Sequence, residues 1–445
     1  MTPDGPRLFL PRFFATELKT YTREQASGMK ALGDRHLGQY TTIDHESEYM
    51  LSAIKLDLNQ NLGKFVADVE DEVAYAFETQ FPPCEGWTSI NLHEKLLRIV
   101  SQASARIFVG PPLNRDSKWL ECTEKFATDA MIGGERLKLW RPFLRPLAQY
   151  FIPELRSVRA DHAEAYRLLR PVLEARTNAA KKDGYEKPND MLQWIQDRVA
   201  TNQDVSIDFK EIAKIQVLTA TAAIHTTRLA IIHAIFDLAA RPEYIEPLRE
   251  ELKDVLEKTD GTITKQSLTQ LRKLDSFMKE SQRHNPPSVG KHFLLLDLDF
   301  RGLTENIATF QRKILKPVKL SNGLELPVGV IVQCNTAILD EAPKHWGDPY
   351  EFDGFRFFKL RSNPSESNQY QFASPTINSM EFGLGKDACP GRFFASNQIK
   401  IVLAHVIRNY EIRLEHPQKG RPKNLMFEVN VLADPTARIM LKRKS

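Results

Sequence analysis

The stretch from Phe209 to Arg241 constrains the fold most strongly, because it holds 33 residues without glycine or proline and is rich in alanine, isoleucine and leucine. Pro242 closes it. Such a run predicts one long buried helix. Its most apolar part, Leu229 to Ala240, is interrupted by His233 and Asp237, so it is too short and too polar to cross a bilayer. Helix is therefore expected to predominate.

The remaining periodic segments support the same fold class. Apolar residues at helical spacing predict helices over 245–256, 268–283 and 399–410. Strand signals are confined to short runs such as 319–332 and 434–441. The expected class is mainly α with minor β.

Length and composition limit the organisation of the chain and its partners. The 445 residues contain no long Gly/Ser-rich, Pro-rich or like-charge linker and no repeat, so one domain over 1–445 is expected. A hydrophobic content of 42% is enough for a large core. The net charge of +4 forms no continuous basic stripe, which argues against nucleic-acid binding.

The four cysteines, together with the N-terminus, indicate the compartment. They show no CxxC pairing, which argues against a disulfide framework or structural zinc and favours a reducing compartment. Met1 to Arg12 lacks the apolar core of a signal peptide, and no stretch reaches the length of a membrane span. The chain as written is expected to be soluble and cytoplasmic. We expect buried, inert thiols at three of the four cysteines, namely Cys84, Cys122 and Cys334.

The fourth cysteine, Cys389, lies in the segment that carries most chemical information, Phe382 to Ala395. It stands at an expected helix start, where backbone N–H groups and the helix dipole stabilise a thiolate. Gly383 and Gly385 permit close approach of the backbone to a flat ligand. A thiolate that donates electron density to haem iron favours O–O cleavage. A dinucleotide fingerprint over Gly383 to Ala388 is the alternative, but it requires a preceding strand and a βαβ unit.

The segment resembles the haem-ligand signature of the cytochrome P450 family, Phe-x-x-Gly-x-x-x-Cys-x-Gly. Two further segments, Glu280-Ser281-Gln282-Arg283 and Phe352 to Phe357, resemble the Glu-x-x-Arg motif and the later arginine segment of that family. The resemblance runs from about Leu10 to the C-terminus and implies a single-domain cytochrome P450 fold. It implies haem b with Cys389 as iron ligand, supported by Phe382, Gly383, Gly385 and a propionate-binding Arg312. It also implies a structural ion-pair trio of Glu280, Arg283 and Arg356.

Within the long helix, Ala222 to Thr227 resembles the oxygen-activation segment of the family. The resemblance assigns catalytic positions to Thr226 and His225, with His225 standing where relatives generally have an acid. A mid-helix threonine can pass protons toward bound oxygen, or it can donate to its own i−4 carbonyl and bend the helix.

The implied function is a haem-dependent monooxygenase of fungal secondary metabolism that acts on an apolar natural product, of the terpenoid or indole-terpenoid class. NADPH would supply electrons through a separate NADPH-cytochrome reductase, and such relatives sit at the endoplasmic reticulum membrane. Four basic residues offer a candidate docking face for the reductase, with ordinary dispersed surface charge as the favoured alternative: Lys386, Arg392, Lys400 and Arg408. A haem-thiolate isomerase or dehydratase, an inactive product of a defective gene and, remotely, a non-haem cysteine enzyme stay open as alternatives.

The sequence departs from the family pattern in three places. The usual N-terminal anchor and Pro-rich hinge are missing, so either the protein is soluble or its true start lies upstream; we favour the second, which makes the fold N-terminally truncated. Asp387 stands where relatives have a cation for a haem propionate, and it would repel that group unless a cation such as Arg312 intervenes. Residues 290–308 form an extra segment. Its codons can hold splice-donor, branch and acceptor sequences, and we expect a retained intron.

Overall fold

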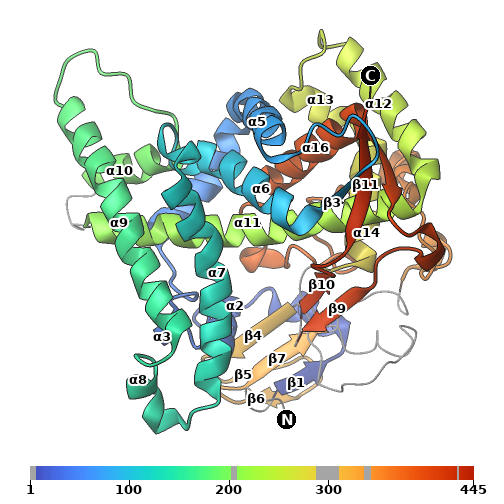
Figure 1. Ribbon diagram of the computed structural model, residues 1–445. Helices are drawn as coiled ribbons and strands as arrows, with labels where there is room; N and C mark the ends of the chain where they lie inside the picture. The colour runs from blue at the N-terminus through green and yellow to red at the C-terminus, as the bar shows by residue number, and fades with distance from the viewer. Residues whose placement is uncertain (1–6, 202–207, 287–309, 335–341, 428–429, 445) are drawn as a thin grey trace. The chain divides into compact units, whose positions relative to one another are not determined.

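The computed structural model describes residues 7–201, 208–286, 310–334, 342–427 and 430–444 (Figure 1). The expected insertion at 290–308 lies outside these residues. By their contacts the residues form two compact units. Unit 1 comprises 1–31, 83–93 and 229–445, and unit 2 comprises 32–82 and 94–228. Helices make up most of the described residues, and the sheets are small, so the predicted class of mainly α with minor β is confirmed.

The long central helix is present as α11, Phe209–Ala240. It ends one residue earlier than predicted, because Arg241 leaves helical geometry (φ −136°, ψ 69°), as residues before proline do. By length and composition α11 is the one described helix that could cross a membrane, but 61% of its most apolar window is buried inside the protein. That burial is typical of a core helix.

The other predicted helices are found with two corrections. The helix expected over 245–256 is α12, Ile245–Glu257. The single helix expected over 268–283 is two helices, α13 (Lys265–Gln270) and α14 (Arg272–His284), because Leu271 adopts φ −71° and ψ 69° between them. The helix expected after Cys389 is α16, Arg392–Asn409, and Tyr410 already belongs to a strand.

In unit 1 a four-stranded sheet supports the loop that carries Cys389. Its order is β1 (Arg7–Leu10), β7 (Ile331–Cys334), β4 (Phe310–Ile314) and β2 (Ala26–Ser27), with β1 parallel to β7 and the other pairs antiparallel. Met380 and Leu384, from the loop before Cys389, are buried in one apolar cluster with Phe310, Ile314 and Val332 of this sheet. The loop before Cys389 is therefore anchored to the sheet through this shared apolar cluster. A second, antiparallel sheet joins β3 (Thr88–Asn91), β11 (Arg438–Arg443) and β8 (Tyr410–Leu414).

Unit 2 is helical. Its most extensive contact between two helices joins α7 (Ser117–Lys138) and α9 (Pro153–Ala179), which lie side by side in Figure 1. Gly133 permits this close approach, because a Cβ there would lie 2.7 Å from Leu155 Cδ2 of α9. Asp116 caps α7 by accepting from the backbone N–H groups of Lys118 and Trp119. A short helix, α8 (Arg145–Ala148), lies in the connection between α7 and α9.

Candidate functional site

The Cys389 loop is a tight turn held by its own backbone. The N–H of Cys389 donates to the carbonyl of Phe382 at 2.7 Å, which closes the segment between them. Inside it Gly383 and Gly385 have φ of +74° and +70°, a region that favours glycine. A Cβ on Gly385 would also lie 2.8 Å from Lys19 Cβ. Both predicted glycines are thus required by backbone conformation.

The thiol of Cys389 lies half-buried, three residues before α16 begins. Burial raises the pKa of this thiol, while the backbone N–H groups of Gly391 and Arg392 and the positive charge of Arg392 act in the opposite direction. Arg392 also donates to the carbonyl of Cys389 at 2.8 Å, which holds its guanidinium beside the loop. Phe382 packs edge-on against Phe372, with ring centroids 5.2 Å apart. The surroundings therefore contain donors that favour a negatively charged sulfur.

The other three cysteines differ from Cys389 in their burial. Cys84, Cys122 and Cys334 are buried. Burial raises the pKa of Cys122 and of Cys334 to about 12, so both thiols stay protonated near neutral pH. Among the residues that the structure describes, no group of three or more His, Cys, Asp or Glu side chains could hold a metal ion.

Asp387 is paired with two arginines of unit 1. Its Oδ1 lies 2.9 Å from Arg23 Nε and its Oδ2 lies 3.2 Å from Arg312 Nε. Arg312 is buried and also donates to the carbonyl of Leu384, which lies inside the turn between Phe382 and Cys389, at 3.3 Å. The Asp387 carboxylate therefore has two cationic partners, one of which is Arg312. Arg23 lies 364 positions away from Asp387 along the chain, and no motif in the sequence marks it as a partner of that carboxylate.

The ion-pair trio is assembled in the interior of unit 1. Glu280 is fully buried and accepts from Arg283 Nε at 2.9 Å and Nη2 at 2.7 Å, while Arg356 Nε lies 3.2 Å from its Oε1. The guanidinium of Arg356 also donates to the carbonyls of Asp348 and Glu351. Burial acts to raise the pKa of Glu280, but hydrogen bonds and charge from Arg283 and His284 outweigh it and lower the pKa to about 2. The trio therefore joins α14 to the first residue of α15 (Arg356–Leu360) and to the segment before it.

Thr226 and His225 lie on α11 within unit 2. The hydroxyl of Thr226 is exposed and donates to the carbonyl of Ala222 at 2.8 Å, which is the back-bonded arrangement weighed above. The Nε2 of His225 lies 3.1 Å from the carbonyl of Glu124 on α7. Burial and the charge of Arg228 lower the pKa of His225 to about 4, so the ring is neutral near pH 7.

One of the four basic residues expected on the docking face, Lys400, is not on the surface. Lys400 is buried, and its Nζ lies 2.6 Å from Asp275 Oδ1 and donates to the carbonyl of Leu268 at 3.1 Å. Lys386 and Arg408 are exposed. Lys400 was wrongly grouped with them, because position on a helix alone did not reveal its buried carboxylate partner.

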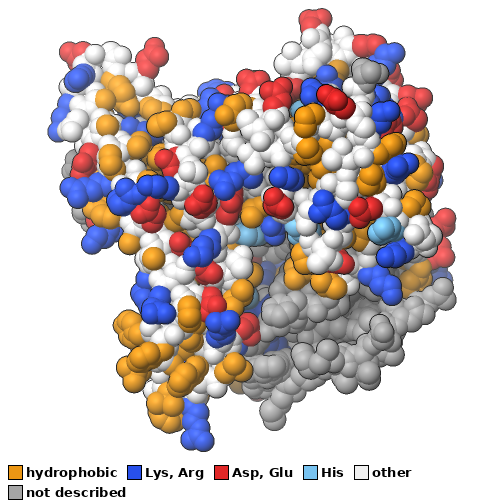
Figure 2. Space-filling model, viewed as in Figure 1, with side chains coloured by type: hydrophobic (Ala, Val, Ile, Leu, Met, Phe, Trp, Pro, Cys, Tyr) orange, Lys and Arg blue, Asp and Glu red, His pale blue; other side chains and the backbone are white. Residues whose placement is uncertain are grey.

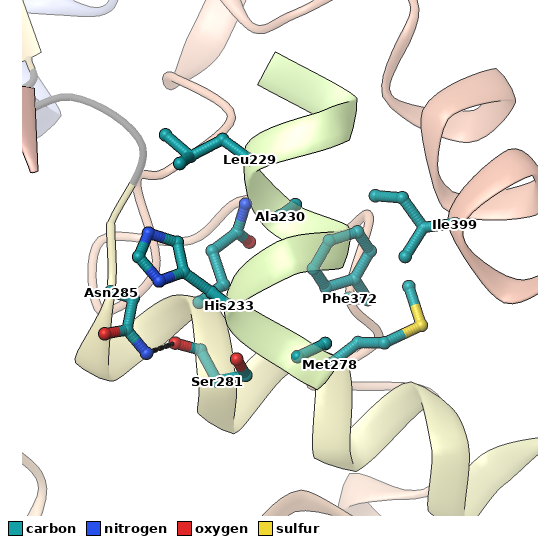
Figure 3. Close-up of a pocket in the computed structure, with 10 residues that line it drawn as sticks. Leu229, Ala230, His233, Met278, Ser281, Asn285, Phe372 and Ile399 are labelled. Atoms are coloured by element: carbon teal, nitrogen blue, oxygen red, sulfur yellow. Dashed lines mark hydrogen bonds between the residues drawn. The ribbon is translucent and has the colours of Figure 1, made fainter. Parts of the chain in front are cut away.

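A small cavity lies between α11, α14 and α16 of unit 1 (Figure 3). Its volume is about 10 Å³, near the least that holds one water molecule and far too small for a haem or a substrate. His233 lines it and accepts from Arg421 through Nδ1 at 3.0 Å, so Nε2 carries the proton. Among the described residues this Nε2 has no hydrogen-bond partner. One enclosed water would satisfy it.

Asp237, the second polar interruption of the long helix, is the centre of a buried network. Its carboxylate pairs with Arg241 at 2.8 Å and with Arg421 at 2.6 Å. It also accepts from Ser281 at 2.6 Å and Asn285 at 3.2 Å, both on or next to α14. Asp237 thus joins α11 to α14, and both Asp237 and His233 lie outside the Cys389 loop.

Comparison with known proteins identifies the family. The family model for Cytochrome P450 matches residues 57–308 and 303–442. The chain is 60% identical to the cytochrome P450 monooxygenase braC of Annulohypoxylon truncatum, covering 100% of this chain and 84% of braC. It is 36% identical to the cytochrome P450 monooxygenase BOA4 of Botryotinia fuckeliana, covering 100% of this chain and 85% of that relative. The solved structure of retinoic acid bound cyanobacterial CYP120A1 shares the fold, with a TM-score of 0.69 at 16% identity, covering 98% of this chain and 89% of that one. The chain therefore belongs to the cytochrome P450 family and is an oxidoreductase of the monooxygenase type, a class whose cofactor is haem.

Proposed function

We propose that this monooxygenase binds haem b through Cys389 and inserts one oxygen atom of O2 into an apolar natural product, of the terpenoid or indole-terpenoid class. The observation that carries the proposal is the Cys389 turn, in which a half-buried thiol faces the N–H groups of Gly391 and Arg392. Haem iron with a thiolate ligand supplies cleavage of the O–O bond. A backbone that contributes N–H donors and a nearby cation suits a thiolate ligand.

The residues around the loop also fit a haem carboxylate. Arg23 and Arg312 carry two positive charges against the single negative charge of Asp387, so the cluster has one positive charge left for a propionate. In this assignment Arg312 binds the propionate and Asp387 positions its guanidinium. Asp387 thereby also lowers the attraction, because it partly cancels the charge.

The charge balance predicts opposite effects for two substitutions in this cluster. Arg312→Gln should speed haem loss by about tenfold, since one charge-assisted hydrogen bond is removed. Asp387→Asn should slow haem loss several-fold, since both guanidiniums become free to attract the propionate. The measurement is transfer of haem to excess apomyoglobin. Arg361→Gln, which disrupts a buried pair with Asp275 elsewhere, is the control. Equal rates for wild type and Arg312→Gln would exclude Arg312 as a propionate ligand.

The other site residues are assigned roles in proton transfer, in positioning and in the structure of the protein. The hydroxyl of Thr226 donates to the carbonyl of Ala222, and a rotation about χ1 would release it; in this assignment the released hydroxyl passes a proton during the reaction. His225 is neutral and held by the Glu124 carbonyl, so in this assignment it orients α11 instead of relaying protons. Glu280, Arg283 and Arg356 are assigned a structural role in the interior of unit 1.

Electrons are proposed to come from NADPH through a separate NADPH-cytochrome reductase. Exposed Lys386 and Arg408 remain as the cationic residues of the proposed docking face, with Arg392 half-buried beside Cys389. By analogy with relatives, we place the enzyme at the endoplasmic reticulum membrane.

The reaction type is tested with ¹⁸O2. The chain, a fungal reductase and NADPH are incubated with a panel of terpenoid and indole-terpenoid substrates, and the products are analysed by mass spectrometry. A monooxygenase gives a product with a single ¹⁸O and consumes NADPH in step with it. A rearranged or dehydrated product formed without NADPH would instead establish the isomerase or dehydratase alternative.

The remaining alternative is an inactive product of a defective gene, with 290–308 as a retained intron. Sequencing of transcripts tests it directly. Transcripts that keep the segment in most copies would exclude an intron, and a spliced transcript encoding Val289-Ala-Thr309 would define the active chain.

A further inference from the structure

Lys279 of α14 is a buried cation beside the segment that leads into the Cys389 turn. Figure 2 shows lysine and arginine side chains spread over the surface, where water solvates their charge. Lys279 is instead only 3% exposed. A buried ammonium needs hydrogen-bond acceptors and a counter-ion, because the loss of its hydration is otherwise not offset. The partners of Lys279 lie within unit 1.

The ammonium of Lys279 has two acceptors in the segment 371–381. It donates to the hydroxyl of Ser379 at 2.7 Å and to the carbonyl of Gln371 at 3.2 Å. Ser379 is itself buried, and its hydroxyl donates onward to Oε2 of Glu381 at 2.7 Å. The hydroxyl therefore accepts from the cation and donates to the carboxylate. We call the three side chains Lys279, Ser379 and Glu381 the lysine link.

Glu381 serves as the counter-ion of Lys279, because the other nearby carboxylate is already matched. Asp275 lies one turn before Lys279 on α14, but it pairs with Lys400 at 2.6 Å and with Arg361 at 3.3 Å. Burial lowers the pKa of Lys279, and the negative charges of Glu381 and Asp275 act against that shift. Without the charge of Glu381, the interior would hold a cation that Asp275 cannot also neutralise.

Glu381 leads directly into the turn that presents Cys389. The carbonyl of the next residue, Phe382, accepts from the N–H of Cys389 at 2.7 Å, and this hydrogen bond closes the turn. A second connection starts from the same face of α14, where Asp275 accepts from the N–H of Phe372 at 3.0 Å. The ring of Phe372 packs against that of Phe382, with centroids 5.2 Å apart. One face of α14 thus reaches Phe382 by two routes.

We propose that the lysine link positions Cys389. Lys279 acts through Ser379 and Glu381 on the backbone of Phe382, and so fixes where the N–H and the thiol of the cysteine lie. Lys279 is accordingly a positioning residue and not a catalytic one. The inference rests on the proposed function, since the position of the thiol matters for the reaction only if Cys389 binds haem iron.

Hydrogen exchange of the full haem-loaded chain, followed by mass spectrometry of peptides that span 379–391, tests the proposal. Lys279→Met, Ser379→Ala and Glu381→Gln should each raise the exchange rate of this segment about tenfold, because each removes or weakens a charge-assisted hydrogen bond. Lys138→Met is the matched control. Lys138 is 12% exposed and pairs with Glu135 at 2.5 Å, but it lies in unit 2, so the exchange of 379–391 should stay as in wild type.

The double variant Lys279→Met with Glu381→Gln separates a specific link from a general loss of stability. It should exchange more slowly than Glu381→Gln alone, because no buried ammonium is then left without its anion. A spectroscopic readout follows the same order. The carbon monoxide band of thiolate-ligated haem should convert to the neutral-thiol band about tenfold faster in Glu381→Gln than in wild type, and more slowly again in the double variant.

Wild-type exchange of 379–391 in both Ser379→Ala and Glu381→Gln would overturn the proposal. A double variant whose rate equals the product of the two single effects would overturn it as well. Ser379→Ala keeps the test decisive even if Lys279→Met does not fold. If exchange responds as expected but no protein, wild type included, shows a thiolate band, the lysine link holds the turn and the proposed haem ligation by Cys389 fails.

Discussion

Replacement of Cys389 by alanine is expected to abolish the carbon monoxide difference band of the reduced chain at the position typical of thiolate-ligated haem. Monooxygenase activity should fall below detection with it. The reason is that no second sulfur can take over, since Cys84, Cys122 and Cys334 are all buried. Reduced, haem-loaded protein is titrated with carbon monoxide, and the Soret region is compared with that of wild type.

Two further variants make this result specific. Cys334→Ala removes a buried thiol whose pKa is raised to about 12, so the thiolate band should remain unchanged. Cys389→His keeps a ligand at the same position of the turn, and its band should move to the position of imidazole ligation. If Cys389→Ala retained the thiolate band, Cys389 would not be the ligand. The Cys389→His variant keeps the test decisive even if the alanine variant loses haem.

Local pattern predicted the parts of the fold that depend on local interactions. The 33-residue run without glycine or proline predicted α11 to within one residue, because helix periodicity and the Pro242 stop are both local. The break at Leu271 was missed, since no proline or glycine marks it and the capping box of Thr264 with Ser267 starts a separate helix, α13. Tyr410 fitted the helical spacing but pairs with Arg443 in a sheet, a contact with a distant part of the chain.

In the candidate site too, the residues that depend on local contacts were predictable from the sequence and those that depend on distant contacts were not. Motif spacing gave Cys389, Gly383 and Gly385 because the turn is closed within its own segment. It could not give Arg23, whose pairing with Asp387 depends on how the first strands pack beside the loop. It also misplaced Lys400, because a lysine at a helical position is usually solvated and only the fold brings Asp275 to it.

Substitution of Glu280 by glutamine is expected to lower the free energy of unfolding by about 3–5 kcal/mol. The carboxylate is fully buried and is shared by two guanidiniums, at 2.7 Å from Arg283 and 3.2 Å from Arg356. A neutral amide would leave both cations in the interior without their anion. Urea unfolding, followed by circular dichroism, measures the change. Glu246→Gln is the matched control, because Glu246 also pairs with an arginine three positions along a helix but is 70% exposed, and the cost there should stay below ~1 kcal/mol.

Acidification should remove this difference between wild type and Glu280→Gln. The pKa of Glu280 is lowered from 4.5 to about 2, so its contribution to stability is fully present above pH 4.5 and is lost as the pH falls from there toward 2. Other carboxylates titrate in the same range, but they do so equally in both proteins. The gap between the two unfolding free energies should therefore be constant from pH 7 to pH 5 and shrink below pH 4.5. A gap that stays the same down to pH 3 would mean that the carboxylate of Glu280 is not the charge that holds Arg283 and Arg356 in place.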